Sequence, residues 1–232
     1  MSKIQFEPVD TQRQSELVAR QIKSRVMATD ISAGDRLPSE QTLTRDLNVS
    51  RPVVREAMRI LETNGLVDIK KGRGGGIFVS HNFHKPLRDT MISLVDSGRV
   101  DIDQVNSIRL LLEPYSAIQA CQNATDDELR SLKVLLEDSR KNWGNASLLK
   151  KNNLKFHVRM AEISGNPILA ILVRSIIELL AELVFKRLDL NLEHRFVDIH
   201  EGIYDALQSR NRKLVEYLVK EDLIEINKEL AR

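Results

Sequence analysis

The chain has 232 residues, of which 42% are apolar and 29% are charged, and its formal net charge at pH 7 is +2. No run reaches the roughly 18 uninterrupted apolar residues that a membrane-spanning helix needs, and the N-terminus lacks a signal-peptide pattern, so we expect a cytoplasmic protein without membrane contact. The single cysteine, Cys121, excludes an intrachain disulfide and fits a reducing compartment.

Three helices and a hairpin are predicted in the first 80 residues. Residues 14–30 have helical periodicity, with Leu17, Val18, Ile22 and Val26 as the buried stripe. Two further helices begin after the capping residues Ser39 and Ser50, and a basic, glycine-rich turn joins two short strands. The expected ranges are 40–48, 51–64, 66–70 and 76–80. This order of elements is typical of a winged helix-turn-helix.

Three arginines stand four residues apart in the third helix, at Arg51, Arg55 and Arg59. Residues with this spacing share one helix face, and arginine near the start of a recognition helix can bond guanine in the major groove. The basic turn, with Lys71 and Arg73, suits contact with phosphates and the minor groove. For the arginine row alone, a solvated face with Arg55 paired to a nearby acid is the alternative.

From about residue 84 onward the pattern is helical throughout. Seven segments carry it, and Pro114 should kink the second of them. We therefore predict a mainly α protein, in which a winged helix-turn-helix is followed by an all-α bundle of six to seven helices. The predicted domains are a DNA-binding domain over residues 1–80, a linker over 81–86, and an effector-binding and dimerisation domain over 87–232.

Four polar residues in the helical part could form a metal site. Asn153 and His157 lie four apart on one helix face, and later helices supply His200 and Asp222. An amide oxygen, two imidazoles and a carboxylate suit a divalent transition metal such as zinc, nickel or manganese. The alternative is a set of unrelated surface and core residues, because three helices must bring these side chains together.

The motifs resemble a known family over residues 12–230. GDRLPSEQTLTRDLNVSRPVVREAMRILETNGLV followed by KGRGGGIFV is similar to the DNA-binding domain of GntR-type bacterial transcription regulators. IRLLLEPYSA, FHVRMAEISGNP and IHEGIYDAL resemble the all-helical FCD-type effector domain of the FadR-like branch. The resemblance implies a homodimeric, ligand-responsive transcription regulator of metabolic genes, most simply a repressor, that binds double-stranded operator DNA.

The resemblance also implies site residues. Arg51 and Arg55 match base-contacting arginines, and Lys71 with Gly72 matches the tip of the wing, whereas Gln41 stands where FadR has a further arginine. The full set of expected DNA contacts is Arg36, Ser39, Gln41, Ser50, Arg51, Pro52, Val53, Arg55, Lys71, Gly72 and Arg73.

In metal-binding relatives, an aspartate and three histidines form the site, and here these positions read Asn153, His157, His200 and Asp222. Either the site still binds a metal, or its polar groups hold an organic effector directly. Arg109 is expected to pair with a carboxylate of the effector or, alternatively, to form a salt bridge with Glu113; Asn166 is a further expected contact. The competing function is a metal-dependent enzyme that uses His157, His200 and Asp222. We expect no enzyme, because no nucleophile or general base accompanies these residues.

Overall fold

The computed structural model describes residues 14–28, 31–184 and 189–230, and the chain divides into two compact units between Pro86 and Leu87. The first unit contains α1 (Gln14–Ala28), α2 (Glu40–Asp46), α3 (Arg51–Thr63), β1 (Val67–Lys70) and β2 (Gly76–Val79). The second contains α4 (His84–Asp96), α5 (Ile102–Asn123), α6 (Asp126–Lys141), α7 (Ala146–Ile163), α8 (Pro167–Val184), α9 (Leu190–Gln208) and α10 (Arg212–Leu230). The predicted fold class, a winged helix-turn-helix followed by a helical bundle, is confirmed.

The core of the first unit lies between α1 and α3. Val54, Met58 and Leu61 are buried on α3, so the arginine row lies on another face of that helix. The predicted stripe of α1 is wrong at Leu17, which is 47% exposed; Ala19 is buried instead. The shift follows from the helical period, because Ala19 is three residues before Ile22 and shares its face.

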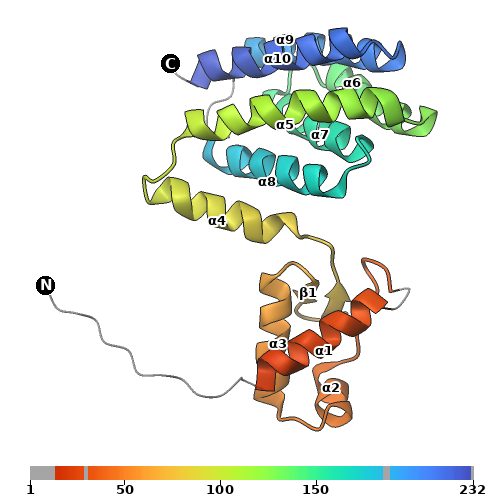
Figure 1. The fold of residues 1–232 in the computed structure, drawn as a ribbon, viewed down its shortest axis with the longest axis vertical. Helices are drawn as coiled ribbons and strands as arrows, with labels where there is room; N and C mark the ends of the chain where they lie inside the picture. The colour runs from red at the N-terminus through yellow and green to blue at the C-terminus, as the bar shows by residue number, and fades with distance from the viewer. Residues whose placement is uncertain (1–13, 29–30, 185–188, 231–232) are drawn as a thin grey trace, which may run out of the picture. The chain divides into compact units, whose positions relative to one another are not determined.

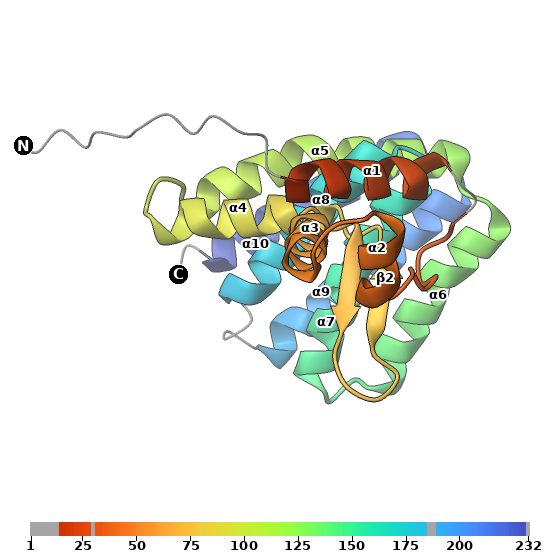
Figure 2. The ribbon, with the colours of Figure 1, turned by 90° about the horizontal axis from the view of Figure 1, so that it is seen from below.

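The wing is the antiparallel hairpin of β1 and β2, paired from Val67 opposite Val79 to Lys70 opposite Gly76 (Figure 2). Its connecting turn contains Gly72 and Gly74, both with positive φ, where a side chain would be strained. The glycines therefore permit the tight turn that places the basic residues at the tip of the wing.

The first helix of the bundle overlaps the range predicted as a linker. Helix α4 starts at His84, inside the range 81–86 predicted as a linker, and His84 is itself buried. Helix α5 runs through Pro114 from Ile102 to Asn123. Helix α6 begins with a capping box, since the side chains of Thr125 and Glu128 bond each other's backbone N–H groups. None of the described helices is long and apolar enough to cross a membrane.

Helices α5 to α10 lie side by side (Figure 1), and their contacts give their directions. Glu113 of α5 contacts His157 of α7, and further along both helices Asn123 bonds the carbonyl of Ser164. The thiol of Cys121 lies against the carbonyl of Ala206 on α9. Helices α5, α7 and α9 therefore run in the same direction. Helix α10 runs the opposite way, because Arg210, just before it, bonds the last carbonyls of α5.

Candidate functional site

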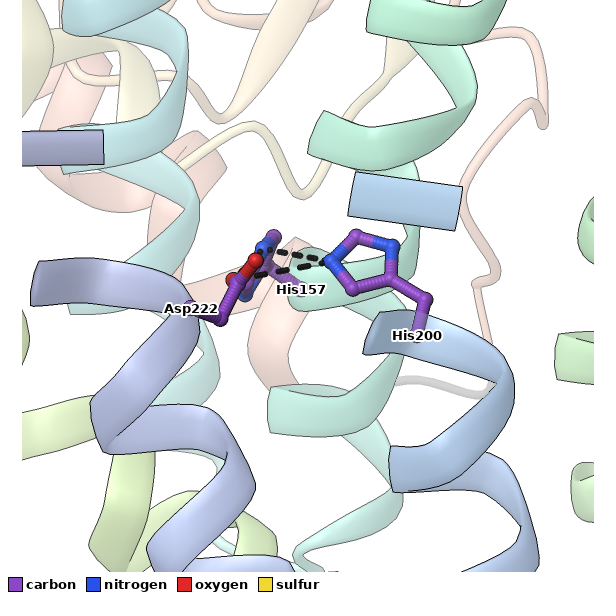
Figure 3. A group of neighbouring side chains, drawn as sticks. All are labelled: His157, His200 and Asp222. Carbon is purple, nitrogen blue, oxygen red and sulfur yellow. Dashed lines mark hydrogen bonds and ion pairs between the residues drawn. The ribbon is translucent and has the colours of Figure 1, made fainter. Parts of the chain in front are cut away.

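His157 of α7, His200 of α9 and Asp222 of α10 come together in the interior of the helical unit (Figure 3). Nε2 of His157 lies 3.2 Å from Nε2 of His200 and 3.1 Å from Oδ2 of Asp222, while Nε2 of His200 lies 3.5 Å from the same oxygen. The three side chains are at most 2% exposed. Two ring nitrogens and a carboxylate thus face one another in a site closed to solvent.

The spacing of these atoms fits a metal ion. Ligand atoms held 2.0–2.2 Å from a tetrahedral zinc lie roughly 3.3–3.6 Å apart, close to the three separations observed. Among the described residues, the Asp222 carboxylate receives no regular hydrogen bond, and its ion-pair contacts are with the two imidazoles. A buried carboxylate in this position needs a compensating positive charge. The two histidines and Asp222 are therefore the residues that would hold a divalent cation.

Glu113 of α5 contacts His157 at Nδ1, the ring nitrogen that does not face the other two side chains of the cluster. Its Oε2 lies 2.6 Å from Nδ1 of His157, although neither atom makes a regular hydrogen bond with a described residue. Its Oε1 accepts a 2.5 Å hydrogen bond from Nε of Arg109. A carboxylate behind a histidine favours the tautomer that leaves Nε2 free to bind a metal. Of the two roles expected for Arg109, the salt bridge with Glu113 is thus present.

The charges of the cluster are strongly coupled. Burial raises the pKa of the Glu113 carboxyl, but the positive charges of Arg109 and His157 outweigh this effect and lower the pKa to about 2. Burial also opposes a proton on His157, yet Glu113 and Asp222 raise its pKa to about 9. For His200 burial prevails and lowers the pKa. Without a metal, a proton on His157 thus compensates the two carboxylates, and a metal has to displace it.

The two asparagines expected at the site differ in position. Asn153 is buried one helical turn before His157 on α7, so it faces the cluster from the same side of the helix. Asn166 is exposed and precedes α8, where its Oδ1 accepts hydrogen bonds from the backbone N–H groups of Ile168 and Leu169. The structure therefore assigns Asn166 to capping α8 and does not bring it to the cluster.

The DNA-binding candidates on α2 and α3 lie mostly on the surface. Arg51, Pro52 and Arg55 are exposed, and Gln41 is exposed on α2. Nη2 of Arg55 lies 3.4 Å from Oε2 of Glu40, so the acid pairing considered for this arginine also exists. Because the Arg55 side chain is 61% exposed and that of Glu40 is 36% exposed, the contact is weak and leaves Arg55 able to reach a base or a phosphate.

Other candidates have structural roles in the same unit. Ser39 caps α2 through its hydroxyl, whereas Ser50 caps α3 without a side-chain hydrogen bond, and Val53 is half-buried beside the core. Nη2 of Arg36 donates a 2.7 Å hydrogen bond to the carbonyl of Gly75 and thereby supports the turn of the wing. The wing-tip residues are all exposed, namely Lys71, Gly72 and Arg73.

A winged helix-turn-helix with an exposed arginine row, followed by a helical domain with a buried polar site, defines a DNA-binding transcription regulator with a sensory domain. Two family models match the chain: the bacterial regulatory proteins of the gntR family over residues 14–79, and the FCD domain over residues 104–224. The chain belongs to the GntR family of bacterial transcription regulators, in the FadR-like group that carries an FCD domain.

Known relatives agree with this assignment. The HTH-type transcriptional repressor NanR of Cronobacter sakazakii is 28% identical over 88% of this chain and 80% of its own length. The NanR of an Enterobacter species is 29% identical over 87% of this chain and 79% of its own length. These relatives are regulators, and this chain is accordingly a ligand-responsive DNA-binding regulator and not an enzyme.

Solved structures share the fold. The GntR of Streptococcus agalactiae superposes with a TM-score of 0.67 at 23% identity, over 92% of this chain and 99% of that one. McbR/YncC of E. coli superposes with a TM-score of 0.51 at 18% identity, over 95% of this chain and 98% of that one. At these identities, the likeness extends to the architecture alone.

Sequence reasoning named Glu113 only as an alternative partner of Arg109 and missed its contact with His157. It also missed three polar residues two helical turns before cluster residues, which are the buried Asn106 and Glu193 and the half-buried Lys150. A signal was available: each stands seven residues before Glu113, His157 or His200, a spacing that keeps both residues on one helix face.

Proposed function

We propose that this protein is a metal-dependent, homodimeric repressor that releases its operator when a small carboxylate effector binds in the helical domain. The observation that carries the proposal is the meeting of His157, His200 and Asp222, with ligand-atom separations that suit a metal and a buried carboxylate whose ion-pair contacts among the described residues are the two imidazoles. Repression is supported by the relatives, which are named as repressors.

In the proposed site, His157, His200 and Asp222 hold a zinc, nickel or manganese ion, and Asn153 completes the set through its amide oxygen. The ion would supply an open position for an anionic oxygen of the effector. Glu113 keeps Nε2 of His157 directed at this position, and Arg109 keeps Glu113 in place. Nη2 of Arg109 is buried and has no hydrogen-bond partner among the described residues, so it can still donate to a carboxylate.

DNA binding is proposed for the exposed face of α3 and for the wing. Arg51 and Arg55 would read base edges in the major groove, with Pro52, Val53, Gln41 and Ser50 beside them. Lys71, Gly72 and Arg73 would contact the backbone or the minor groove. Arg36 and Ser39 would act mainly by holding the wing and α2 in place, because their polar groups already bond within the protein.

The proposed dimer uses an apolar face of α5 and α8. Ile108, Leu111 and Tyr115 lie on one face of α5 at a spacing of three and four residues and are 45%, 70% and 52% exposed. Helix α8 packs beside α5 and adds Ile168 and Leu172. Apolar side chains gathered in this way suit contact with a second copy, and a two-fold dimer would present two recognition helices to a palindromic operator.

The test of the proposed function begins with selection of bound sequences from a random double-stranded DNA library. A palindromic site bound by the wild type and lost in the Arg51→Ala, Arg55→Ala double variant would support the operator proposal. Adding a metal and a panel of carboxylates to that complex then tests release. Failure of every carboxylate to change the affinity for DNA, with metal present, would contradict the effector proposal.

A further inference from the structure

A groove of about 790 Å³ runs along α7 on the surface of the helical domain. Helix α7 packs against α6 and α8, whereas α6 and α8 make no comparable contact with each other among the described residues. Helix α7 is therefore the floor of the groove, and α6 and α8 are its walls. Lys155 of the groove stands two residues before His157, about 200° around the helix, so the groove lies on the opposite side of α7 from the buried histidine cluster.

The floor and the walls of the groove carry apolar side chains. Leu154 and Val158 stand one turn apart on α7 and are half-buried. Leu135 of α6 and Ile177 and Ala181 of α8 join them. Apolar surface that is gathered in a groove and left partly exposed is typical of a contact site.

Polar contacts tie the three helices together at one end of the groove. Nε of Arg159 on α7 donates a 2.8 Å hydrogen bond to Oγ of Ser131 on α6, and its Nη1 donates a 3.1 Å hydrogen bond to Oε2 of Glu162. Nη2 of Arg174 on α8 donates to Oε1 of the same carboxylate. Both arginines are thus engaged within the protein.

The other end of the groove carries two cations without a described partner. Lys151 and Lys155 stand one turn apart on α7 and are exposed, and neither makes a hydrogen bond or an ion pair with a described residue. The acids that line the groove are already engaged, Glu162 by the two arginines and Glu178 by Arg88. Two uncompensated positive charges therefore stand beside the apolar floor.

We propose that this groove binds an acidic amphipathic helix of a partner protein. Charge complementarity favours an acidic partner, because Lys151 and Lys155 lack anions. A helix is favoured over an extended segment, because α6, α7 and α8 bond their backbone groups internally and offer no edge for strand addition, whereas a helix satisfies its own backbone on an apolar floor. From Lys151 to Glu162 the groove covers eleven residues of α7, or about 16 Å, which accommodates about three turns of a partner helix.

The groove stays free in the proposed dimer. Ile168 and Leu172 belong to the proposed dimer face, and Ile177 and Ala181 of the groove each follow one of them by nine residues. Nine residues make two and a half turns, so the groove lies on the opposite side of α8. Partner binding at the groove therefore adds to the proposed function and requires neither metal nor effector.

The first test selects binders from a displayed library of 14-residue helices on the full-length protein. An excess of double-stranded DNA occupies the basic face of α3 during the selection. We expect the enriched peptides to carry apolar residues at positions i, i+3, i+4 and i+7 with Asp or Glu beside them, and selection on Lys151→Glu, Lys155→Glu to enrich Lys or Arg instead. Uncharged or basic peptides on the wild type, the same peptides on both proteins, or no enrichment would overturn the inference.

The second test measures the affinity of the tightest acidic peptide, and of its twin with every acid changed to Lys, by fluorescence anisotropy. The wild type should prefer the acidic peptide at least tenfold, and Lys151→Glu, Lys155→Glu should reverse this preference. Val158→Thr keeps the volume of the floor but makes it polar, and it should weaken binding about 3- to 10-fold. Lys133→Glu, Lys141→Glu makes the same charge change between α6 and α9 and should bind as wild type. Equal losses in both lysine pairs would show that net charge alone attracts the peptide, which contradicts the groove.

Two other occupants would give different results. If Lys151→Glu, Lys155→Glu lowers the mass measured by light scattering, the groove joins copies of this chain. If sodium dodecanoate below its micellar concentration binds through the two lysines and no peptide binds, the occupant is an anionic lipid. Either result would overturn the proposed partner.

Discussion

The carboxylate of Glu113 lies 2.6 Å from Nδ1 of His157, on the side of the ring away from His200 and Asp222. This contact decides which ring nitrogen of His157 is available, because Nδ1 is engaged and Nε2 faces the other two side chains. Arg109 in turn holds Glu113. A row of three residues from two helices thus orients one candidate ligand.

Replacing Glu113 should therefore weaken metal binding without removing a ligand. For Glu113→Gln we expect metal affinity to fall about 10- to 100-fold, because His157 loses its orienting carboxylate and Arg109 loses its anionic partner. Competition with a zinc-binding dye measures this change. Glu137→Gln, at an exposed position of α6, is the control, and equal affinities in both variants would refute the supporting role of Glu113.

Metal content tests the ligand set. Mass spectrometry on untagged protein should find about one metal ion per chain after incubation with zinc, nickel or manganese, and His157→Ala, His200→Ala should abolish it. Asn153→Asp should raise metal affinity, since an anionic oxygen replaces a neutral one at a residue one turn before His157. An unchanged affinity in Asn153→Asp would exclude residue 153 from the ligands.

Arg51 and Arg55 of α3 should differ from Lys71 of the wing in their effect on DNA binding. Arg51→Ala or Arg55→Ala is expected to reduce the free energy of DNA binding by about 1–3 kcal/mol and to relax the preference at one base position. Lys71→Ala should weaken binding to all DNA sequences alike, and it should lower the slope of log affinity against log salt concentration by about one. Fluorescence anisotropy at several salt concentrations separates these results. Arg130→Ala, exposed on α6, serves as the control, and a uniform loss for Arg51→Ala would indicate a phosphate contact.

The proposed dimer face can be tested by introducing one charged residue. Leu111, at 70% exposure, is the most exposed large apolar residue of α5, and Leu111→Glu should convert the dimer into monomers because it places an unpaired charge in the apolar contact. Light scattering after size-exclusion chromatography reports the mass. Val134→Glu changes a 58% exposed residue on α6 in the same way and should remain dimeric. If both variants have the mass of the wild type, the interface lies elsewhere.

Glu193 should make the stability of the protein depend on pH. Burial raises its pKa to about 7 from 4.5, so the folded state binds a proton that the unfolded state has released between these values. The contribution of the group to stability is therefore complete below pH 4.5 and is lost as pH rises through 7. Urea denaturation of wild type and Glu193→Gln at several pH values should show the variant gaining relative stability from pH 5 to pH 8. A constant difference between them would contradict the raised pKa.

Much of this fold could be predicted from local patterns. The stripe of Val54, Met58 and Leu61 predicts which side of α3 is buried, and the Thr125 and Glu128 pair predicts where α6 begins. The start of α4 at His84 agrees with the helical pattern expected from about residue 84, whereas the burial of His84 follows from tertiary packing, for which the linker composition gives no signal.

The sequence by itself determined the order of helices and strands, the arginine row and the chemical identity of the candidate metal ligands. Those properties follow from neighbours within one or two helical turns. Only the tertiary structure decided that His157, His200 and Asp222 share one interior, that Glu113 supports His157, that Asn166 caps a helix, and that Asn106 and Glu193 are buried as well. Periodicity specifies the buried face of each helix, whereas packing between helices decides which faces meet and in which direction they run.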